Sequence, residues 1–302
     1  MLISEQNLAA LFKGVKMAYN AGHSAAKPLW PQLATLVPSN TKEEQYSWLG
    51  QFPRLREWVG DRVIKNLKAY GYSIKNRKFE STISIPRDDI EDDTYGIFKP
   101  LFEEMGASAA AHPDELLFEL ILSGFATKCY DGRAFFDANH EVVASDGDVT
   151  PVSNVQLPAN PADAKPAWFL LDTSRPLKPF IFQQRRPYNF VTLDKEADEN
   201  VFMRQEYIYG VDGRMNVGFG FWQQAFGSKL ELNAANFGAA YNAMTALKTE
   251  EGRSLGIKPN LLLIGNANRE AAFFIAQADK LANGQPNPNY GLLDVVVTSH
   301  LD

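Results

Sequence analysis

Residues 70–125, YGYSIKNRKFESTISIPRDDIEDDTYGIFKPLFEEMGASAAAHPDELLFELILSGF, decide the fold of this chain. The stretch joins a polar, strand-forming segment, the arm (residues 70–86), to an acidic segment, the acidic knot (residues 87–93), and then to a long helical pattern. Apolar residues in the arm recur mostly at every second position, with charged residues between them. This alternation predicts strands that are at best half buried. The apolar members are Tyr72, Ile74, Phe79, Ile83 and Ile85.

An arm of this kind is expected to need a partner. An isolated two-stranded hairpin is only marginally stable in water. A long exposed strand edge also invites pairing with another chain. We therefore expect a protruding ribbon that an adjacent copy completes, which favours assembly over catalysis.

A long amphipathic helix is predicted after the arm. Asp88 and Asp89 mark its acidic start, where exposed backbone N–H groups and the helix dipole favour carboxylates. Pro113 lacks the N–H of a helix interior, so a break or kink near Ala111 and then a second helix from Pro113 to Gly124 are expected. The apolar stripe of the first part consists of Phe98, Leu101, Phe102, Met105 and Ala109.

The composition is that of a soluble chain with about two domains. Of its 302 residues, 45% are hydrophobic and 22% are charged. No apolar run approaches the roughly 18 residues that span a bilayer, and the first residues show no secretory signal. The single cysteine, Cys129, excludes an intrachain disulfide, and the net charge of −6 argues against a dedicated nucleic-acid binder.

The sequence before the arm predicts a small amphipathic helix and then an irregular segment. The helix is expected to end near Gly22, and prolines interrupt residues 23–45. Trp30, Trp48 and Trp58 lie in or near this segment. Because large aromatic side chains on extended chain need cover, we expect an arm that wraps over its own body or over an adjacent subunit.

The remaining sequence predicts a loop, a β region and a compact α/β unit. Residues 128–166 are rich in Pro, Asn, Asp and Gly and read as a long loop. The runs WFLLD, PFIFQ, YNFVTL, VFMRQEYIYG and MNVGFGFWQ predict antiparallel strands over residues 168–227. Helices capped by Asn233 and spanning residues 269–281 then alternate with the strands NLLLIG and LLDVVVTSHL.

The sharpest catalytic candidate is a Gly-x-Ser-x-Gly pattern at residues 252–256. With Asp294 and His300 following in order, Ser254 could act as a hydrolase nucleophile. Such a serine needs a buried strand before it and a helix after it. Here the charged run ALKTEE precedes it and Pro259 follows it, so a turn is favoured.

No metal or cofactor site is predicted. Asp137 and His140 could share an ion, but a surface turn is the favoured interpretation. A serine hydrolase that uses Ser254 is kept as the alternative function. A sugar- or peptide-binding module that uses exposed tryptophans is the third.

Seven blocks of the sequence closely resemble the major head subunit of Mu-like tailed bacteriophages. They follow the same order over nearly the whole chain. The blocks are YSWLGQFPRLREWVGDR, GYSIKNRKFESTISIPRDDIEDD, GIFKPLFEEMGASAAAHPDELLFELILSGF, CYDGRAFFDANH, WFLLDTSRPLKPFIFQQRRP, EYIYGVDGRMNVGFGFWQQA and GRSLGIKPNLLLIG.

The resemblance implies an α+β, HK97-like capsid fold in a major capsid protein that is not an enzyme. The order of its strands looks permuted, and residues 168–227 are expected to fill the space usually taken by the C-terminal strands. The implied divisions are an N-terminal arm (1–45), an extended loop region (46–86), a peripheral domain with a spine helix (87–140), a loop with antiparallel strands shared by the peripheral and axial domains (141–228), and an axial domain (229–302).

The resemblance also implies partners and a location. Pentamers and hexamers would form an icosahedral shell in the virion, built in the bacterial cytoplasm, that encloses double-stranded DNA without reading its sequence. A scaffold, a maturation protease, a portal and decoration proteins are implied partners, and no membrane is. Nothing marks a lysine in or just before the arm as reactive, so assembly is expected to be noncovalent; these lysines are Lys65, Lys68, Lys75 and Lys78.

The candidate interface residues combine the arm, the acidic knot and the tryptophans. They are Trp30, Trp48, Trp58, Tyr72, Ile74, Arg77, Phe79, Ile83, Arg87, Asp88 and Asp89.

Overall fold

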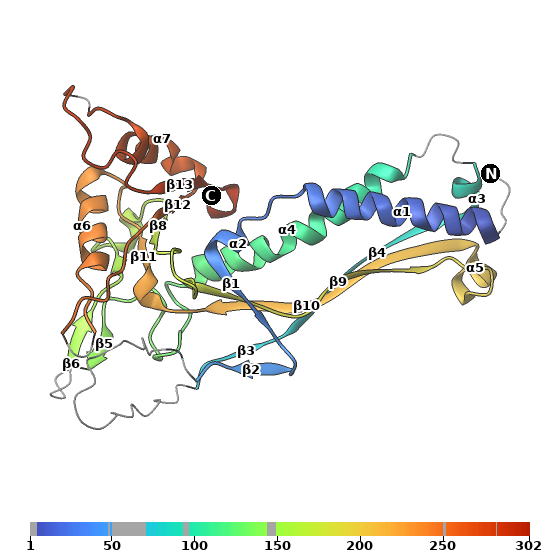
Figure 1. Cartoon of the computed structure of the whole chain (residues 1–302), viewed down its shortest axis with the longest axis horizontal. Helices are drawn as coiled ribbons and strands as arrows, with labels where there is room; N and C mark the ends of the chain where they lie inside the picture. The colour runs from blue at the N-terminus through green and yellow to red at the C-terminus, as the bar shows by residue number, and fades with distance from the viewer. Residues whose placement is uncertain are drawn as a thin grey trace.

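The protein has two parts, which a computed structural model shows side by side along its longest axis (Figure 1). A long four-stranded sheet with two helices along it extends from a compact unit that surrounds a five-stranded sheet. None of the helices in the described ranges combines the length and the apolar character that a bilayer span needs. The structure describes residues 5–47, 49, 71–92, 97–143, 149–249, 252–281 and 283–302.

The long sheet has the strand order β1-β9-β10-β4. Its central strands, β9 (Phe180–Leu193) and β10 (Glu206–Phe219), pair antiparallel, with shifts of register beside Arg214. β4 (Arg77–Pro86) pairs antiparallel with β10 over all 10 of its residues. β1 (Ala34–Pro38) pairs parallel with β9, so β1 and β4 form the two edges.

Much of the predicted arm therefore belongs to this sheet. One edge of β4 is fully paired, and its residue Ile85 is buried against the body of the molecule. β3 (Ser73–Lys75) lies outside the long sheet and pairs antiparallel with β2 (Glu43–Gln45). The prediction of a ribbon that its own molecule cannot satisfy is wrong for β4, because β10 supplies the missing partner.

Two long helices, α1 (Glu5–Ala25) and α4 (Lys99–Ser123), pack against each other along the long sheet (Figure 1). Their backbones approach closely at Gly106. A Cβ atom there would lie 2.0 Å from the carbonyl oxygen of Tyr19. A larger residue at Gly106 would force the helices apart, so glycine is needed at this crossing.

α4 continues through Pro113, so the prediction of a break with a second helix is wrong, and the alternative of a kink near Ala111 stays a prediction. Pro113 cannot donate the helical hydrogen bond to Ala109, a loss that costs roughly 3 kcal/mol in a helix interior. The helix is nevertheless buried on both sides of the proline. Phe102 packs in one apolar cluster before it, and Leu117 and Ile121 pack in another after it. This burial outweighs the local preference.

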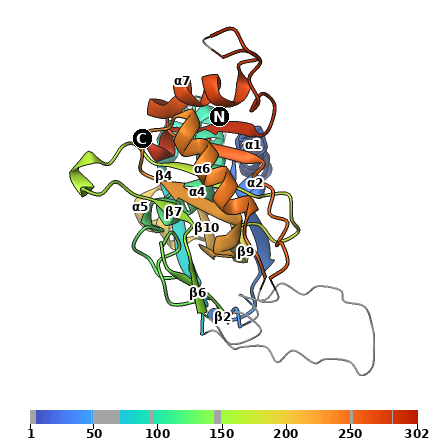
Figure 2. The same ribbon diagram turned by 90° about the vertical axis from the view of Figure 1, so that its left-hand side faces the viewer.

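The compact unit is built on a sheet of order β13-β12-β8-β11-β7, with β13 (Asp294–Val297) and β7 (Val155–Gln156) at its edges. Every residue of β8 (Trp168–Leu171), β11 (Ala225–Ser228) and β12 (Leu261–Ile264) is buried. Figure 2 faces this unit and shows α6 (Ala234–Thr245) crossing in front of it. As predicted, Asn233 caps α6, and its side chain accepts a hydrogen bond of 2.9 Å from a backbone N–H of the first turn.

The remaining elements are shorter. The helices are α2 (Trp30–Leu33), α3 (Arg87–Glu91), α5 (Glu199–Arg204) and α7 (Arg269–Ala272), and the strands are β5 (His140–Val143) and β6 (Val149–Val152). Single turns of 3-10 or π helix lie at Pro161–Asp163, Trp222–Gln224, Asn266–Asn268, Phe273–Gln277 and Ser299–Leu301.

Several predicted stretches differ from the structure. Residues 201–204, expected in a strand, belong to α5, and residues 34–38, expected to be irregular, form β1. The loop predicted over residues 128–166 contains the β5–β6 hairpin. The helix predicted over residues 269–281 ends at Gln277, after a π-helical turn.

The strands of residues 168–227 are divided between the two sheets. β9 and β10 form the centre of the long sheet, whereas β8 and β11 lie within the five-stranded sheet. The permuted strand order itself stays a prediction.

Candidate assembly interface

A buried polar network fixes two segments of the chain, residues 39–46 and residues 72–76, to the long sheet. At its centre is Gln183 of β9, which is fully buried. Its side chain accepts a hydrogen bond from the Tyr46 hydroxyl (2.8 Å). It also donates to the Ile74 carbonyl (3.0 Å) and to Asn76 Oδ1 (2.9 Å). We call this network the arm root; its members are Ser39, Glu44, Tyr46, Tyr72, Ile74, Asn76, Gln183 and Gly218.

The outer layer of the arm root is closed by a carboxylate. The Asn76 side chain donates to Ser39 Oγ (2.8 Å) and to the Thr41 carbonyl (3.0 Å). Glu44 accepts from the backbone N–H groups of Asn40 (2.8 Å) and Thr41 (3.0 Å) and from the Ser39 hydroxyl (2.9 Å). These hydrogen bonds, first the one from Asn40, lower the pKa of Glu44 to about 2.

Tyr72 and Gly218 lock the inner side of the arm root. The Tyr72 hydroxyl accepts a hydrogen bond of 2.7 Å from the Phe219 backbone N–H, and burial raises the pKa of Tyr72 to about 12. A Cβ atom on Gly218 would lie 2.2 Å from Cδ1 of Ile74 and 3.0 Å from the Tyr72 hydroxyl. Gly218 therefore leaves the space into which β3 docks.

The predicted interface residues of β4 divide between the surface and the body. Arg77 is exposed, and its guanidinium lies 5.1 Å from the centre of the Phe79 ring. Half-buried Phe79 packs on His112 of α4, with ring centres 4.3 Å apart. The Tyr188 hydroxyl lies 2.8 Å from Nδ1 of His112, and burial lowers the pKa of that imidazole. Ile83 is also half buried.

The acidic knot forms a separate short helix. Arg87 begins α3, and its backbone N–H donates to the Gln205 carbonyl (2.7 Å). Asp88 and Asp89 are exposed in the first turn of α3, as expected for a helix start. The helix ends at Glu91 and α4 begins only at Lys99, so the single helix predicted from the knot onward is wrong at its beginning.

Trp30 is covered by its own molecule. The centre of its half-buried ring lies 4.6 Å from the centre of the Phe182 ring. The buried carboxylate of Asp114 accepts hydrogen bonds of 2.7 Å from the backbone N–H groups of both Leu29 and Trp30. These bonds anchor the segment before β1 to α4. Trp48, Trp58, Lys65 and Lys68 lie outside the described residues.

The Gly-x-Ser-x-Gly pattern lies in a turn. Gly252 and Gly256 have φ angles of +74° and +63°, and Ser254 Oγ accepts a hydrogen bond of 3.1 Å from the Gly256 N–H. His300 stacks on a phenylalanine of α4, with ring centres 5.0 Å apart. Among the described residues, no hydrogen bond joins Ser254 to Asp294 or His300. The arrangement does not support the serine hydrolase.

His140 pairs with Asp131 and not with Asp137. Its fully buried ring stacks on Trp222, and its Nδ1 lies 2.5 Å from the Asp131 carboxylate. Burial opposes ionisation of Asp131, but the hydrogen bond with His140 still holds the pKa of that carboxyl below its usual range. The thiol of Cys129 donates to the same carboxylate (3.2 Å), and burial raises the pKa of that thiol. These hydrogen bonds hold the loop after α4 together.

A helix along a long sheet, a compact unit at one end and an arm fixed to the side define a capsid protein with the HK97-like fold. Two solved structures of bacteriophage JBD30 agree with this conclusion. A chain of its procapsid is 48% identical, with coverage of 99% of this chain and 100% of that chain and a TM-score of 0.89. A chain of its capsid decorated with minor capsid protein trimers is 35% identical, with 92% of each chain covered and a TM-score of 0.75.

Sequence comparison identifies the family. The major capsid protein of Escherichia phage Mu is 37% identical over 305 residues, which cover 100% of both chains. The model of the family described as Mu-like prophage major head subunit gpT matches residues 8–301. The chain belongs to this family and is a major capsid protein of the Mu-like kind, which forms the phage head.

Proposed function

We propose that many copies of the chain assemble as pentamers and hexamers into an icosahedral shell that encloses packaged double-stranded DNA. The supporting observation is the close similarity, over 99% of this chain, to a chain of a phage procapsid. The net charge of −6 fits a container that encloses DNA without binding a particular sequence. Repeated weak contacts in a closed geometry would make such a shell stable.

The parts of the molecule receive different roles in this proposal. The N-terminal arm (1–45) and the extended loop region (46–86) contact adjacent copies. The spine helix lies in the peripheral domain (87–140), and residues 141–228 join this domain to the axial domain (229–302). The axial domain faces the centre of each pentamer or hexamer. Residues of the arm and the acidic knot that are exposed on β4 and α3, Arg77, Asp88 and Asp89, are the proposed contacts.

Other proteins are proposed to act on the shell. A scaffold and a maturation protease would guide assembly in the bacterial cytoplasm, and a portal would occupy one vertex. Decoration proteins are the further partner, since the capsid of the relative from phage JBD30 carries minor capsid protein trimers. The chain itself is proposed to catalyse no reaction, to need no cofactor and to assemble without covalent cross-links.

Purified protein tests the shell directly. Analytical sedimentation over a range of concentrations, followed by electron microscopy, should give particles of uniform size. A chain with Gly106→Leu serves as the misfolded control, because the contact between α1 and α4 has no room for that side chain. A single-chain mass at every concentration would overturn the proposal, and covalent multimers on denaturing gels would overturn noncovalent assembly.

A further inference from the structure

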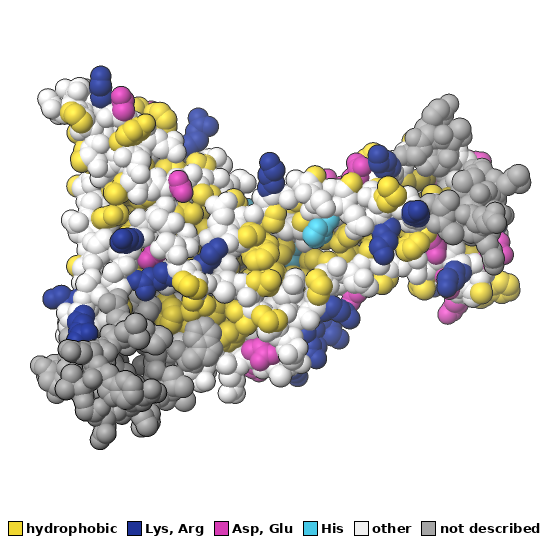
Figure 3. All heavy atoms as spheres, viewed as in Figure 1, with side chains coloured by type: hydrophobic (Ala, Val, Ile, Leu, Met, Phe, Trp, Pro, Cys, Tyr) yellow, Lys and Arg dark blue, Asp and Glu magenta, His cyan; other side chains and the backbone are white. Residues whose placement is uncertain are grey.

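The end of the molecule far from the compact unit carries an exposed apolar knob on α5. Phe202 and Met203 have exposed fractions of 81% and 69%, the two highest among the large hydrophobic residues whose exposure the structure describes. Figure 3 shows hydrophobic side chains at the end where Figure 1 places α5. Two neighbouring side chains of this size are costly to leave in water, which points to an interaction site.

The backbone of α5 that carries the knob is fixed to the end of the long sheet. Val201 and Asn200 of the same helix are buried. The Asn200 side chain donates to the carbonyls of Leu193 (2.9 Å) and Glu206 (2.7 Å), the residues that end β9 and begin β10. One face of α5 is therefore fixed to the sheet while the opposite face presents Phe202. Because the backbone of α5 is fixed, binding through Phe202 costs little backbone entropy.

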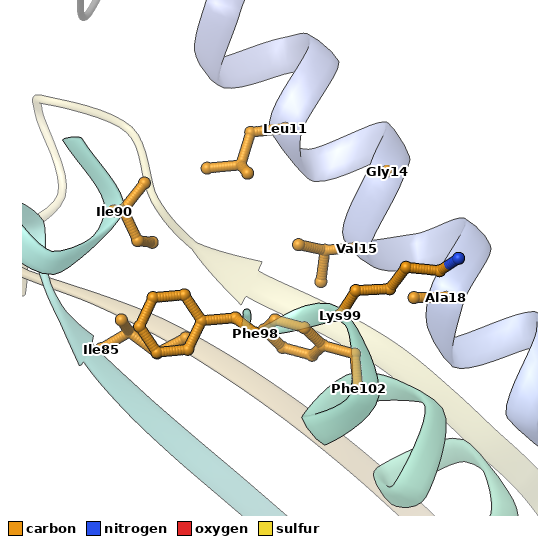
Figure 4. Close-up of a pocket in the computed structure, with 9 residues that line it drawn as sticks. All are labelled: Leu11, Gly14, Val15, Ala18, Ile85, Ile90, Phe98, Lys99 and Phe102. Atoms are coloured by element: carbon orange, nitrogen blue, oxygen red, sulfur yellow. The ribbon is translucent and has the colours of Figure 1, made fainter. Parts of the chain in front are cut away.

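A hydrophobic cavity lies at the same end of the molecule, between α1, α3 and the start of α4. We call it the distal cavity; it has a volume of about 210 Å³ and is lined mainly by Leu11, Val15, Ile85, Ile90, Phe98 and Phe102. In Figure 4 these side chains, which come from three helices and β4, face one another across the space. A buried cavity of about 150 Å³ with Leu, Ile and Phe walls holds a benzene ring, so the distal cavity can hold the ring of a phenylalanine.

The rim of the cavity is open, and charged side chains lie around it. Gly14 lies on the rim, is exposed, and has no atom within 4 Å of the place of its missing Cβ. Lys13 and Lys16 on α1 are exposed, and Asp88 and Asp89 are exposed on α3 beside the cavity. The segment leading into α5 carries exposed Glu196 and Glu199, and Lys195 and Arg204 are exposed as well. Both surfaces carry charges of both signs, which opposite pairing across the contact would satisfy.

We propose that Phe202 of one copy of the chain occupies the distal cavity of a second copy, with Met203 packed at the rim. No residue of α5 lines the cavity of its own chain. Knob and cavity are different surfaces at one end of the molecule, so the contact is heterologous and closes into a ring when copies surround a symmetry axis. The inference rests on the proposed shell and names one of the contacts that join its subunits.

Assembly of Phe202→Asp is the first test. Because Phe202 is exposed, the variant should fold normally, as judged by circular dichroism, but give at least tenfold fewer shells than the wild type. Leu157→Asp is the matched control, since Leu157 has an exposed fraction of 53% and lies in the compact unit; it should assemble normally. Wild-type yields from Phe202→Asp would overturn the proposal. Failure of the wild-type chain itself to form shells would instead refute the shell.

Cross-linking tests the geometry within assembled shells. A chain with Met203→Cys and Gly14→Cys, which keeps Phe202 and places both cysteines at the rim, should give disulfide-linked multimers after mild oxidation. Each single variant should stay monomeric on a nonreducing gel, because the natural Cys129 is buried. Shells of the double variant that yield only monomers would show that the knob lies elsewhere.

Discussion

The two ends of the molecule differ in how completely side chains pack their interiors. In the compact unit the central strands are buried along their whole length, and one large apolar cluster surrounds them. At the far end a smaller cluster around Phe102, Phe190 and Tyr209 leaves the distal cavity unfilled. Phe202 and Met203 remain in solvent nearby. The interior of one end is filled, and that of the other, in our proposal, is completed by a second copy.

The comparison of the two ends also changes which part of the chain is expected to need a partner. The sequence pointed to the arm as the unsatisfied part of the chain. In the structure, β4 pairs with β10 and the buried amide of Gln183 holds both strands of the arm root. A polar alternating strand can thus be a satisfied sheet edge, whereas a short helix that looked like a strand carries the most exposed apolar side chains.

The largest expected effect is a cavity in the compact unit. Phe169 is fully buried and packs on Phe125 and Phe136, with ring centres 5.9 and 5.2 Å apart. Phe169→Ala should lower the free energy of unfolding by about 3–5 kcal/mol, measured by urea denaturation. Phe98→Ala, at the half-buried wall of the distal cavity, should cost only about 1–2 kcal/mol. Equal losses would remove the difference between the two ends.

Next in size is the anchor between the N-terminal segment and α4. Asp114→Ala leaves the backbone N–H groups of Leu29 and Trp30 without their acceptor, so the free energy of unfolding should fall by about 2–3 kcal/mol. Asp114→Asn keeps one acceptor oxygen and should lose less. Hydrogen exchange at the two amides reads out the contact directly. Unchanged protection in the alanine variant would contradict the assigned role.

Features that depend on residues only a few positions apart could be predicted from the sequence. Phe102, Met105 and Ala109 of the predicted stripe in α4 are buried and Asn233 caps α6, as spacing within a few residues indicates, whereas Leu101 of the same stripe is exposed. α5 was missed because it is only 6 residues long and apolar residues at 201–203 fit a strand equally well. The break at Pro113 was wrong because burial on both sides overrides the proline.

The arm root was beyond prediction from spacing. Gln183 and Ile74 are 109 residues apart in sequence, so no window of neighbouring residues shows that they meet. Two signals were available: a polar residue inside the apolar run FIFQ, and Gly218 inside an aromatic strand. Either signal marks a place where a strand needs something other than an apolar side chain.

A smaller effect is expected where the arm docks. Gly218→Ala should push Ile74 aside and lower the free energy of unfolding by about 1–2 kcal/mol, because the added carbon would overlap its Cδ1. Gly71→Ala is the control, since the place of its missing Cβ has no atom within 4 Å. Amide exchange over residues 72–76 should quicken in the first variant alone. Similar exchange in both variants would refute the docking role of Gly218.

The smallest expected effect is a pH response confined to the outer layer of the arm root. The pKa of Glu44 is lowered from its ordinary value of 4.5 to about 2, so its contribution to stability is present above pH 4.5 and is lost as the pH falls toward 2. The protection factors of the Asn40 and Thr41 amides, which account for the slower intrinsic exchange at lower pH, should fall as the pH drops across this window. Glu44→Gln should abolish the pH dependence, whereas Glu43→Gln should preserve it. If both amides stay protected down to pH 2, the ionised carboxylate is not what closes the arm root.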